Sequence, residues 1–455
     1  MNITITKKEN PGKLPETDEL GFGKYFTDHM FLMDYSDTDG WHNARIVPFG
    51  PVSMSPAAGV LHYGAEVFEG LKAYRRPDGG VQLFRPWENM ARLNRSCDRI
   101  GLPRINEEDG LQAIRELVRV DERWVPSEPG TSLYIRPFLY STNPTLSLHG
   151  VYSATFAVIL SPSGNYFKNG LKPVPIMVET EDVRAVRGGT GEAKCGGNYA
   201  AANRAADKAA EKGYAQVLWL DGVERKYVEE GGGMNVMFKI NGTVVTPMLT
   251  GSILPGITRK SCIELLRSQG IPVEERLISV DELFAAAKAG TLEEAWCVGT
   301  AAVISPIGEL AWNGEKYEIN GNKIGPLSQM LYNELTKKEL EYHKKTKLRD
   351  VALLTLLLGT GIRVSECVGL DINDVDFDNG GIKIRRKGGY EAIVYFGDEV
   401  ETALLDYLEQ REHIIPAEGH ENALFLSLQN RRMAVRSVEN LVKKYASRVT
   451  TLKKT

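Results

Sequence analysis

The sequence predicts an α/β protein with a two-lobed body and a separate C-terminal domain. Short β-rich segments alternate with amphipathic helical segments, which indicates a mixed α/β fold. A cluster of Ser, Gly, Asn and Pro between two β-rich regions indicates a linker. All six tryptophans precede residue 336, so the composition shifts there. We therefore expect a small lobe at 1–161, a linker at 162–174, a large lobe at 175–335 and a further domain at 336–455.

The small lobe contains one well-defined helix signal. After a strand beginning at Val81, apolar residues recur at steps of three and four, and Gly101 and Pro103 end the pattern. The repeating positions are Met90, Leu93, Cys97 and Ile100. The segments 131–140 and 152–160 are rich in β-formers and predict strands.

The large lobe begins with two hairpin signals. Segments 216–230 and 235–249 are apolar runs interrupted by Asp-Gly and by Asn-Gly, dipeptides that favour tight hairpin turns. Helical patterns follow at 258–270 and 280–290, and a mixed apolar segment at 293–310 comes after them.

Composition excludes several classes of protein. The net charge is −4, and residues 336–455 hold 20 Lys+Arg against 18 Asp+Glu, so charge alone indicates no polybasic nucleic-acid-binding region. The five cysteines are scattered without metal-ligand spacing, which favours a reducing compartment and predicts no metal site. The longest apolar run, 351–359, is too short to cross a bilayer. We expect a soluble, cytoplasmic protein that does not associate with membranes.

Lys194 lies in a glycine-rich stretch, 187–206, that runs into an alanine-rich segment. One interpretation is a flexible turn with a solvated lysine. The other is Schiff-base chemistry: glycines let a planar cofactor approach the backbone, and a lysine shielded from water becomes nucleophilic. Such a site needs a carboxylate for a ring nitrogen and donors for a phosphate. Candidates are Glu230, Thr258, Thr300 and Arg95.

Six ordered motifs favour the second interpretation, because together they resemble the branched-chain amino acid aminotransferases of the type IV pyridoxal-phosphate fold. The resemblance covers residues 15 to 335. The motifs are EVFEGLKAYRRPDGGVQLFRPWENMARLNRS, YIRPF, GEAKCGGNYAA, VEEGGGMN, GSILPGITRK and GTAAVISPIGEL.

The resemblance implies a role for each matched residue. Lys194 would bind pyridoxal 5'-phosphate covalently and act as the catalytic base, Tyr199 would contact its phenolic oxygen, and Glu230 its ring nitrogen. The residues implied to hold the phosphate are Arg95, Ile257, Thr258 and Thr300. Those implied to contact the substrate are Tyr63, Tyr134, Arg136, Tyr166 and Ala301; the three tyrosines could instead be packed in the core.

The implied reaction is transamination of leucine, isoleucine and valine with 2-oxoglutarate, a step of branched-chain amino acid biosynthesis, by a homodimer whose active site borrows residues from the partner. A D-amino acid aminotransferase or an aminodeoxychorismate lyase of the same fold is the alternative, which GLKAYRR and YIRPF disfavour. The sequence departs from some family members at Gly231–Gly233, which predicts a more mobile loop, and at Cys297 and Val298, which indicates altered local packing. Ala302 and Ser305 stand where other members have a redox-sensitive cysteine pair, so no such switch is expected.

Residues 336–453 resemble a different family, the catalytic domain of tyrosine recombinases of the phage-integrase class. The resemblance implies a partial, mostly α-helical domain with a small β-sheet. Arg363 in TGIRVSE matches the first catalytic arginine, and Lys387 in a hairpin turn matches the general-acid lysine. We expect this tail to be inactive in DNA cleavage, because the sequence stops before the remaining catalytic motifs and Tyr445 belongs to an amphipathic helix. Weak DNA binding, or a recombinase function through the tail, is the alternative from another class. We also expect exposed apolar surface near the helix at 351–359.

Overall fold

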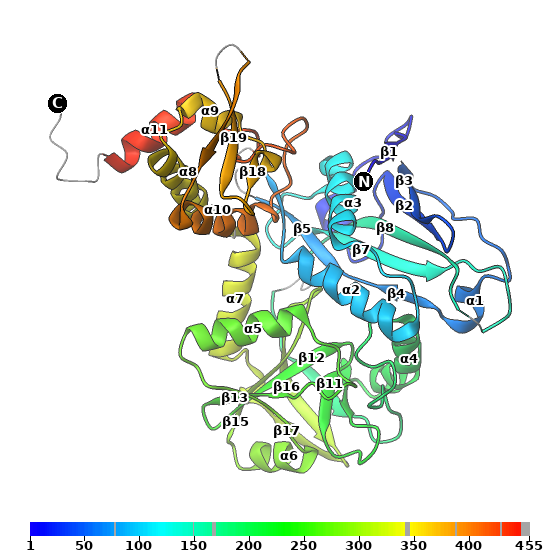
Figure 1. Cartoon of the computed structure of the whole chain (residues 1–455). Coiled ribbons are helices and arrows are strands. Elements are labelled where there is room, and N and C mark those ends of the chain that lie inside the picture. Colours follow the sequence, from blue (N-terminus) through cyan, green and yellow to red (C-terminus); the bar gives the residue numbers. More distant parts are fainter. Residues whose placement is uncertain are drawn as a thin grey trace. The chain divides into compact units, whose positions relative to one another are not determined.

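The computed structural model divides into two compact units (Figure 1). The first unit comprises Met1–Lys72 and Arg85–Lys338, and the second comprises Ala73–Phe84 and Glu339–Thr455. The structure describes residues 1–76, 79–148, 150–165, 170–341, 346–386, 389–427 and 430–446, without the side chains of 337–341, 346–347 and 443–446.

The N-terminal lobe of the first unit is a sheet in the order β1-β3-β2-β8-β7, with β4 also paired to β7. The strands are β1 (Thr4–Ile5), β2 (His29–Ser36), β3 (Gly40–Pro48), β4 (Glu66–Phe68), β7 (Ser132–Ser141) and β8 (Ser153–Ser163). Its helices are α1 (Gly59–Tyr63), α2 (Pro86–Ile100) and α3 (Glu107–Val120). Helix α2 confirms the predicted periodicity: Met90, Leu93 and Cys97 are fully buried, and Gly101 ends the helix in the left-handed conformation, at φ 73°.

The C-terminal lobe of the first unit is a sheet in which β11 pairs with both β10 and β12. The strands β11-β10-β9-β16-β15-β12 therefore form a closed ring, which leaves no open edge within it. The strands are β9 (Val174–Val178), β10 (Gln216–Leu220), β11 (Val228–Gly231), β12 (Met234–Ile240), β13 (Thr243–Pro247), β14 (Val273–Arg276), β15 (Leu292–Gly299), β16 (Val303–Trp312) and β17 (Glu315–Glu318). The helices are α4 (Gly196–Glu211), α5 (Ile257–Ser268), α6 (Val280–Lys288) and α7 (Pro326–Glu341).

Both predicted hairpins are present in this lobe. Strands β10 and β11 pair antiparallel on either side of Asp221 and Gly222, and β12 and β13 pair on either side of Asn241 and Gly242. Asn241 and Gly242 have φ of 48° and 78°, and two positive φ angles in succession are typical of a type I′ turn. The turn signal in the sequence therefore set the register of β12 against β13.

The second unit is mostly helical with a small sheet in the order β18-β19-β20, as predicted. Leu353, Leu356, Tyr407, Phe425 and Val438 belong to its buried core. Its elements are β5 (Leu71–Arg75, of which Ala73–Arg75 belong to this unit), β6 (Val81–Leu83), α8 (Thr346–Thr360), α9 (Val364–Gly369), β18 (Val375–Asp376), β19 (Gly381–Arg385), β20 (Glu391–Tyr395), α10 (Asp398–Arg411) and α11 (Val435–Ala446).

Helix α8 contains the predicted apolar run and exposes part of it, since Leu358 is 86% exposed. Lys387 and the side chain of Tyr445 lie outside the described residues. Among the helices of the described ranges, none is long and apolar enough to cross a membrane.

Candidate active site

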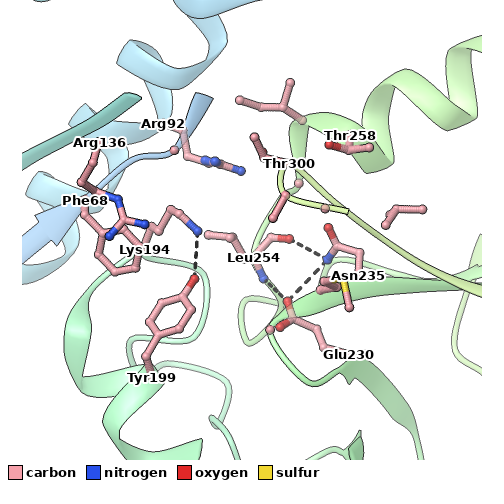
Figure 2. A pocket seen from close by; sticks show the side chains of 18 of the residues that line it. Phe68, Arg92, Arg136, Lys194, Tyr199, Glu230, Asn235, Leu254, Thr258 and Thr300 are labelled. Carbon is pink, nitrogen blue, oxygen red and sulfur yellow. Dashed lines mark hydrogen bonds between the residues drawn. The ribbon is translucent and has the colours of Figure 1, made fainter. Parts of the chain in front are cut away.

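A cavity of about 230 Å³ in the first unit brings together side chains from both of its lobes (Figure 2). Helix α2 and strand β7 contribute from the N-terminal lobe, while α4, α5 and the β15–β16 connection contribute from the other. Sequence-predicted residues on its wall are Tyr134, Arg136, Lys194, Tyr199, Glu230, Ile257, Thr258, Thr300 and Ala301.

Lys194 is held by backbone contacts to the N-terminal lobe. Its N–H donates to Oγ of Ser96 on α2 at 2.9 Å, and its carbonyl accepts from the N–H of Phe68 at 2.9 Å. Its Nζ donates to the hydroxyl of Tyr199 at 2.9 Å and lies 4.9 Å from the centre of the Phe68 ring (Figure 2). Tyr199 lies five residues further along, in the first turn of α4, while Lys194 precedes Cys195, the N-cap residue of that helix.

The surroundings of Lys194 weaken its hold on a proton. Burial, followed by the positive charges of Arg92 and Arg136, lowers the pKa of Lys194 to about 8, while Glu69 and Glu230 oppose the shift. Burial together with the charge of Glu230 raises the pKa of Tyr199, so this phenol stays protonated at neutral pH. The pair therefore combines an amine whose pKa is lowered to about 8 with a hydroxyl group that can still donate a hydrogen bond.

Glu230, at 3% exposure, lies deep in the cavity wall on β11. Its Oε1 accepts from the N–H of Leu254 at 2.9 Å and from Nδ2 of Asn235 at 3.4 Å (Figure 2). Burial raises the pKa of Glu230, and the Arg184 guanidinium and the Leu254 N–H counteract it. Asn235 and Leu254 lie in the quoted motifs VEEGGGMN and GSILPGITRK, but the resemblance implied no role for either residue.

One end of the cavity is built to receive an anion. Helix α5 begins there, and its N-cap residue, Gly256, has no side chain to cap the first N–H groups. Thr258 lies in the first turn of that helix, and Thr300 in the β15–β16 connection also borders the cavity (Figure 2). Uncapped N–H groups, two hydroxyls and the positive end of a helix dipole are suited to a phosphate group.

On helix α2, Arg92 lines the cavity and the expected Arg95 does not. Arg92 is 4% exposed and donates to both carboxylate oxygens of Glu69, at 2.7 and 2.8 Å. Arg95 is exposed and is not among the residues that line the cavity. At 3.6 residues per turn Arg95 lies opposite the apolar stripe of α2, which agrees with its exposure.

The predicted substrate contacts are only partly brought together. Nη2 of Arg136 donates to the hydroxyl of Tyr134 at 2.9 Å, and its guanidinium lies 4.7 Å from the centre of the Phe68 ring. Tyr63 is absent from this cavity: it ends α1, is 44% exposed and lines a second cavity of about 480 Å³. Tyr166 lies outside the described residues.

The glycines around Lys194 do not form the cavity wall, contrary to expectation. Gly188, Gly189, Gly191, Gly196 and Gly197 are all absent from its lining. The glycines that do border it come from other segments: Gly70, Gly233, Gly256 and Gly299. Two of them instead lie close to other segments, since an added Cβ would lie 2.2 Å from the Ser252 carbonyl oxygen at Gly191 and 2.2 Å from Oε1 of Glu66 at Gly196.

Residues 66–310 match the family described as Amino-transferase class IV, which is more than half of the chain. The chain belongs to this family. Class IV aminotransferases depend on pyridoxal phosphate, and the cavity suits such a group: a buried carboxylate, a lysine of lowered proton affinity and an uncapped helix N-terminus face one space.

Named relatives of this class IV aminotransferase are branched-chain enzymes. The chain is 54% identical to branched-chain-amino-acid aminotransferase 2 of Bacillus subtilis (strain 168) over 336 residues, covering 74% of this chain and 92% of that protein. It is 54% identical to branched-chain-amino-acid transaminase 1 of the same organism over 334 residues, covering 73% and 93%.

Solved structures agree with this assignment. The branched-chain aminotransferase of Thermoproteus uzoniensis with norvaline has a TM-score of 0.57 and 31% identity over 70% of this chain and 97% of that one. The T.th. branched-chain aminotransferase with pyridoxamine 5'-phosphate has a TM-score of 0.58 and 26% identity over 69% and 94%.

The C-terminal part of the class IV aminotransferase chain matches another family. Residues 329–453 match the Phage integrase family, in agreement with the predicted fusion. Arg363 is the exposed N-cap residue of α9, and its backbone N–H donates to Oε2 of Glu366 at 2.8 Å.

Proposed function

We propose that this chain is a pyridoxal 5'-phosphate-dependent transaminase that exchanges the amino group of leucine, isoleucine or valine with 2-oxoglutarate. The observation that carries the proposal is the cavity in which the Lys194 amine and the buried Glu230 carboxylate face one space. The substrate class rests on the 54% identity to the branched-chain enzymes of Bacillus subtilis. The same identity favours branched-chain substrates over the D-amino acid and lyase alternatives.

The cofactor, when bound, supplies a ring that accepts the electron pair released at the substrate α-carbon. Lys194 would hold it covalently, and the lysine amine, once free, would move a proton at the substrate α-carbon. Its lowered pKa serves this exchange, because the neutral amine is both nucleophile and base. Glu230 would hold a proton at the ring nitrogen, and Tyr199 would donate to the phenolic oxygen.

The phosphate would lie at the N-terminus of α5. Its partners are the first N–H groups of that helix, the hydroxyls of Thr258 and Thr300, and the guanidinium of Arg92. A multiply charged anion also lowers the cost of burying Arg92 beside the cavity. On the substrate side, Arg136 and Tyr134 offer donors for a carboxylate, and the Phe68 ring with Ala301 offers apolar surface for an aliphatic side chain.

The test is a coupled assay of the purified chain with pyridoxal phosphate and 2-oxoglutarate. L-leucine, L-isoleucine and L-valine should each yield glutamate, and D-alanine should not. Activity with D-alanine in place of L-leucine would move the chain to the alternative class. The three branched-chain substrates should differ by modest factors, because one methylene in an apolar pocket discriminates by about 1–3 kcal/mol.

We also propose that the chain forms a homodimer through the surface around α1 and the segment 143–148. Large apolar side chains are exposed there: Leu61 at 58%, Tyr63 at 44%, Leu146 at 62% and Leu148 at 77%. Apolar side chains gathered in this way are typical of a subunit contact. Light scattering should give twice the monomer mass, and a fully active monomer would contradict this proposal.

For the second unit we propose at most weak DNA binding without strand cleavage. The match to the Phage integrase family favours a nucleic-acid role, while the nearly balanced charge of residues 336–455 does not favour tight binding. A gel shift over a salt series should show weak binding that disappears as salt rises. A covalent protein–DNA adduct on a nicked substrate would overturn the proposed inactivity. We propose a cytoplasmic location from the scattered cysteines.

A further inference from the structure

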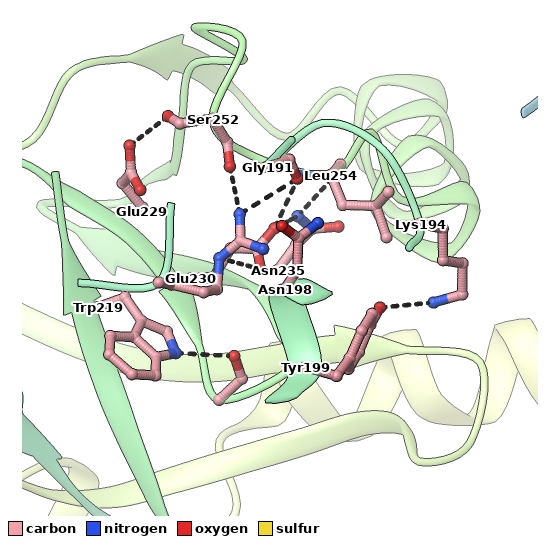
Figure 3. A network of polar contacts seen from close by, with 12 residues as sticks. Gly191, Lys194, Asn198, Tyr199, Trp219, Glu229, Glu230, Asn235, Ser252 and Leu254 are labelled. Atoms are coloured by element: carbon pink, nitrogen blue, oxygen red, sulfur yellow. Dashed lines mark hydrogen bonds and ion pairs between the residues drawn. The ribbon is translucent and has the colours of Figure 1, made fainter. Parts of the chain in front are cut away.

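Arg184, in the segment between β9 and the glycine run, contacts three separate parts of the active-site lobe. Its side chain is only 7% exposed. Nε lies 3.2 Å from Oε2 of Glu230, an ion pair whose geometry falls short of a straight hydrogen bond. Nη2 donates to the carbonyl of Gly191 at 3.3 Å and to the carbonyl of Ser252. Figure 3 shows the network that surrounds these groups.

The three contacts connect segments with different roles. Glu230 is the buried carboxylate of the cavity, Gly191 lies three residues before Lys194, and Ser252 lies in the loop that leads to the N-terminus of α5 (Figure 3). A planar guanidinium can bind acceptors in several directions at once, which an ammonium group does less well. Arg184 therefore connects the loop before Lys194, the strand that carries Glu230 and the loop that leads to α5.

Close packing at Gly191 makes this clamp possible. A Cβ at Gly191 would lie 2.2 Å from the Ser252 carbonyl oxygen and 2.6 Å from Cβ of Ala185, so only glycine lets the two loops approach. Both carbonyls then face the same nitrogen of Arg184. This close approach explains the glycine at position 191, which does not border the cavity.

Charge adds a second reason for an arginine here. Glu229 and Glu230 are consecutive buried residues of β11, at 5% and 3% exposure, and the Ser252 hydroxyl donates to Oε1 of Glu229 (Figure 3). Burial raises the pKa of both carboxyls, and the charge of Arg184 opposes the shift at each. Oε2 of Glu229 has no hydrogen-bond partner among the described residues, so the arginine's ion pair goes to Glu230.

We propose that Arg184 is a positioning residue for transamination, which keeps Glu230 charged and aimed into the cavity and ties its orientation to the loop that carries Lys194. Arg184 does not line the cavity, so it acts through Glu230 and the two loops. The inference rests on the proposed function, because Glu230 matters in this way only if it contacts a cofactor ring.

The experiment compares R184M and R184K with the matched control R99M, using the full chain. Arg99 on α2 also binds the glycine run, donating to the carbonyls of Gly189 at 2.7 Å and of Gly188, but no described contact joins it to Glu230. R99M therefore loosens the same loop and leaves the carboxylate alone. Each variant is measured for melting without cofactor, for pyridoxal phosphate affinity by fluorescence, and for kcat and KM with leucine.

R184M should lower cofactor affinity and kcat by about tenfold to a hundredfold, the usual effect of losing hydrogen bonds to a charged group. KM for leucine should stay within about twofold, because Arg184 touches no substrate surface. R99M should change cofactor affinity, kcat and KM by less than about twofold each. R184K should have a cofactor affinity and a kcat between those of R184M and wild type.

The same substitutions in an E230Q background separate positioning from a general loss of packing. If Arg184 acts through Glu230, R184M and R184K should each add less than about twofold to the loss already caused by E230Q. Equal losses in both backgrounds, or losses no larger than that of R99M, would overturn the inference. If R184M does not fold, the losses caused by R184K in the wild-type and E230Q backgrounds are compared in its place. A wild-type chain that binds no cofactor contradicts the proposed function instead, so the two failures differ.

Discussion

Three charged side chains of the first unit and two buried arginines of the second differ in what they face. In the first unit, Arg92, Lys194 and Glu230 all border one cavity. In the second, Arg349 and Arg411 are also buried, but they donate to nearby carbonyls, those of Leu426 at 3.0 Å and Ala423 at 2.9 Å. The contrast shows that a buried charge indicates a reactive site only where it faces open space together with other such groups.

The same contrast appears in the arginines that sequence reasoning selected. Arg363 of the second unit is exposed at the start of α9, and no cavity described in the structure includes it. The first unit is therefore expected to carry the chemistry of the chain.

The largest effect is expected at Lys194. K194A removes both the covalent attachment point and the base, so transamination of leucine should fall by about ten-thousandfold or more. R363A is the matched substitution in the second unit and should leave the rate unchanged. Glutamate formation in a coupled assay measures both. Full activity in K194A, or a large loss in R363A, would contradict the division of roles between the units.

The second prediction concerns pH. The neutral form of Lys194 attacks the cofactor, and burial lowers its pKa from 10.5 to about 8, so cofactor attachment should speed up as pH rises and level off above about 8. At neutral pH this gives roughly two to three powers of ten more neutral amine than an ordinary lysine has. Stopped-flow absorbance after mixing apoprotein with pyridoxal phosphate follows the rate. A rate still rising steeply to pH 10.5 would show an ordinary lysine.

The third prediction compares two arginines on α2. R92K keeps the charge but loses the bidentate geometry, so pyridoxal phosphate should bind about tenfold more weakly. R95K changes an exposed side chain and should bind the cofactor as wild type does. Fluorescence titration gives both affinities. The reverse ranking would restore the arginine that the sequence alone had selected.

The smallest effect is expected where the chain departs from some family members. A Cβ at Gly231 would lie 2.5 Å from Sγ of Cys297, so an alanine at this position would clash with the cysteine sulfur. G231A should lower the free energy of unfolding by about 1–3 kcal/mol. In a C297A background the same substitution should cost clearly less, because the sulfur is gone. Urea denaturation of the four proteins measures the coupling.

Gly197 provides the control for this cycle. It lies in the first turn of α4, and a Cβ added there would meet nothing within 4 Å, so G197A should be neutral or slightly stabilising. A G231A protein as stable as G197A would show that Cys297 does not restrict this strand.

Local signals in the sequence predicted much of the framework. The periodicity of α2, the turns at Asp221-Gly222 and Asn241-Gly242 and the helices α5 and α6 depend on neighbouring residues, and all are present in the structure. The motifs also named most of the cavity wall, since they carry the side chains themselves. The change of composition near residue 336 agrees with the start of the Phage integrase match at residue 329.

The sequence by itself determined the family, the two-part organisation, and the lysine and carboxylate of the site, because these depend on residue type and order along the chain. Tertiary structure alone decided that Arg92 and not Arg95 lines the cavity, that Tyr63 does not line the cavity of its own chain, and that Gly191 packs closely against Ser252. It also joined Arg184 to Glu230, 46 positions apart in the chain. Contacts of this kind form only when strands and loops distant in sequence meet, and no local pattern records which side chains then share a space.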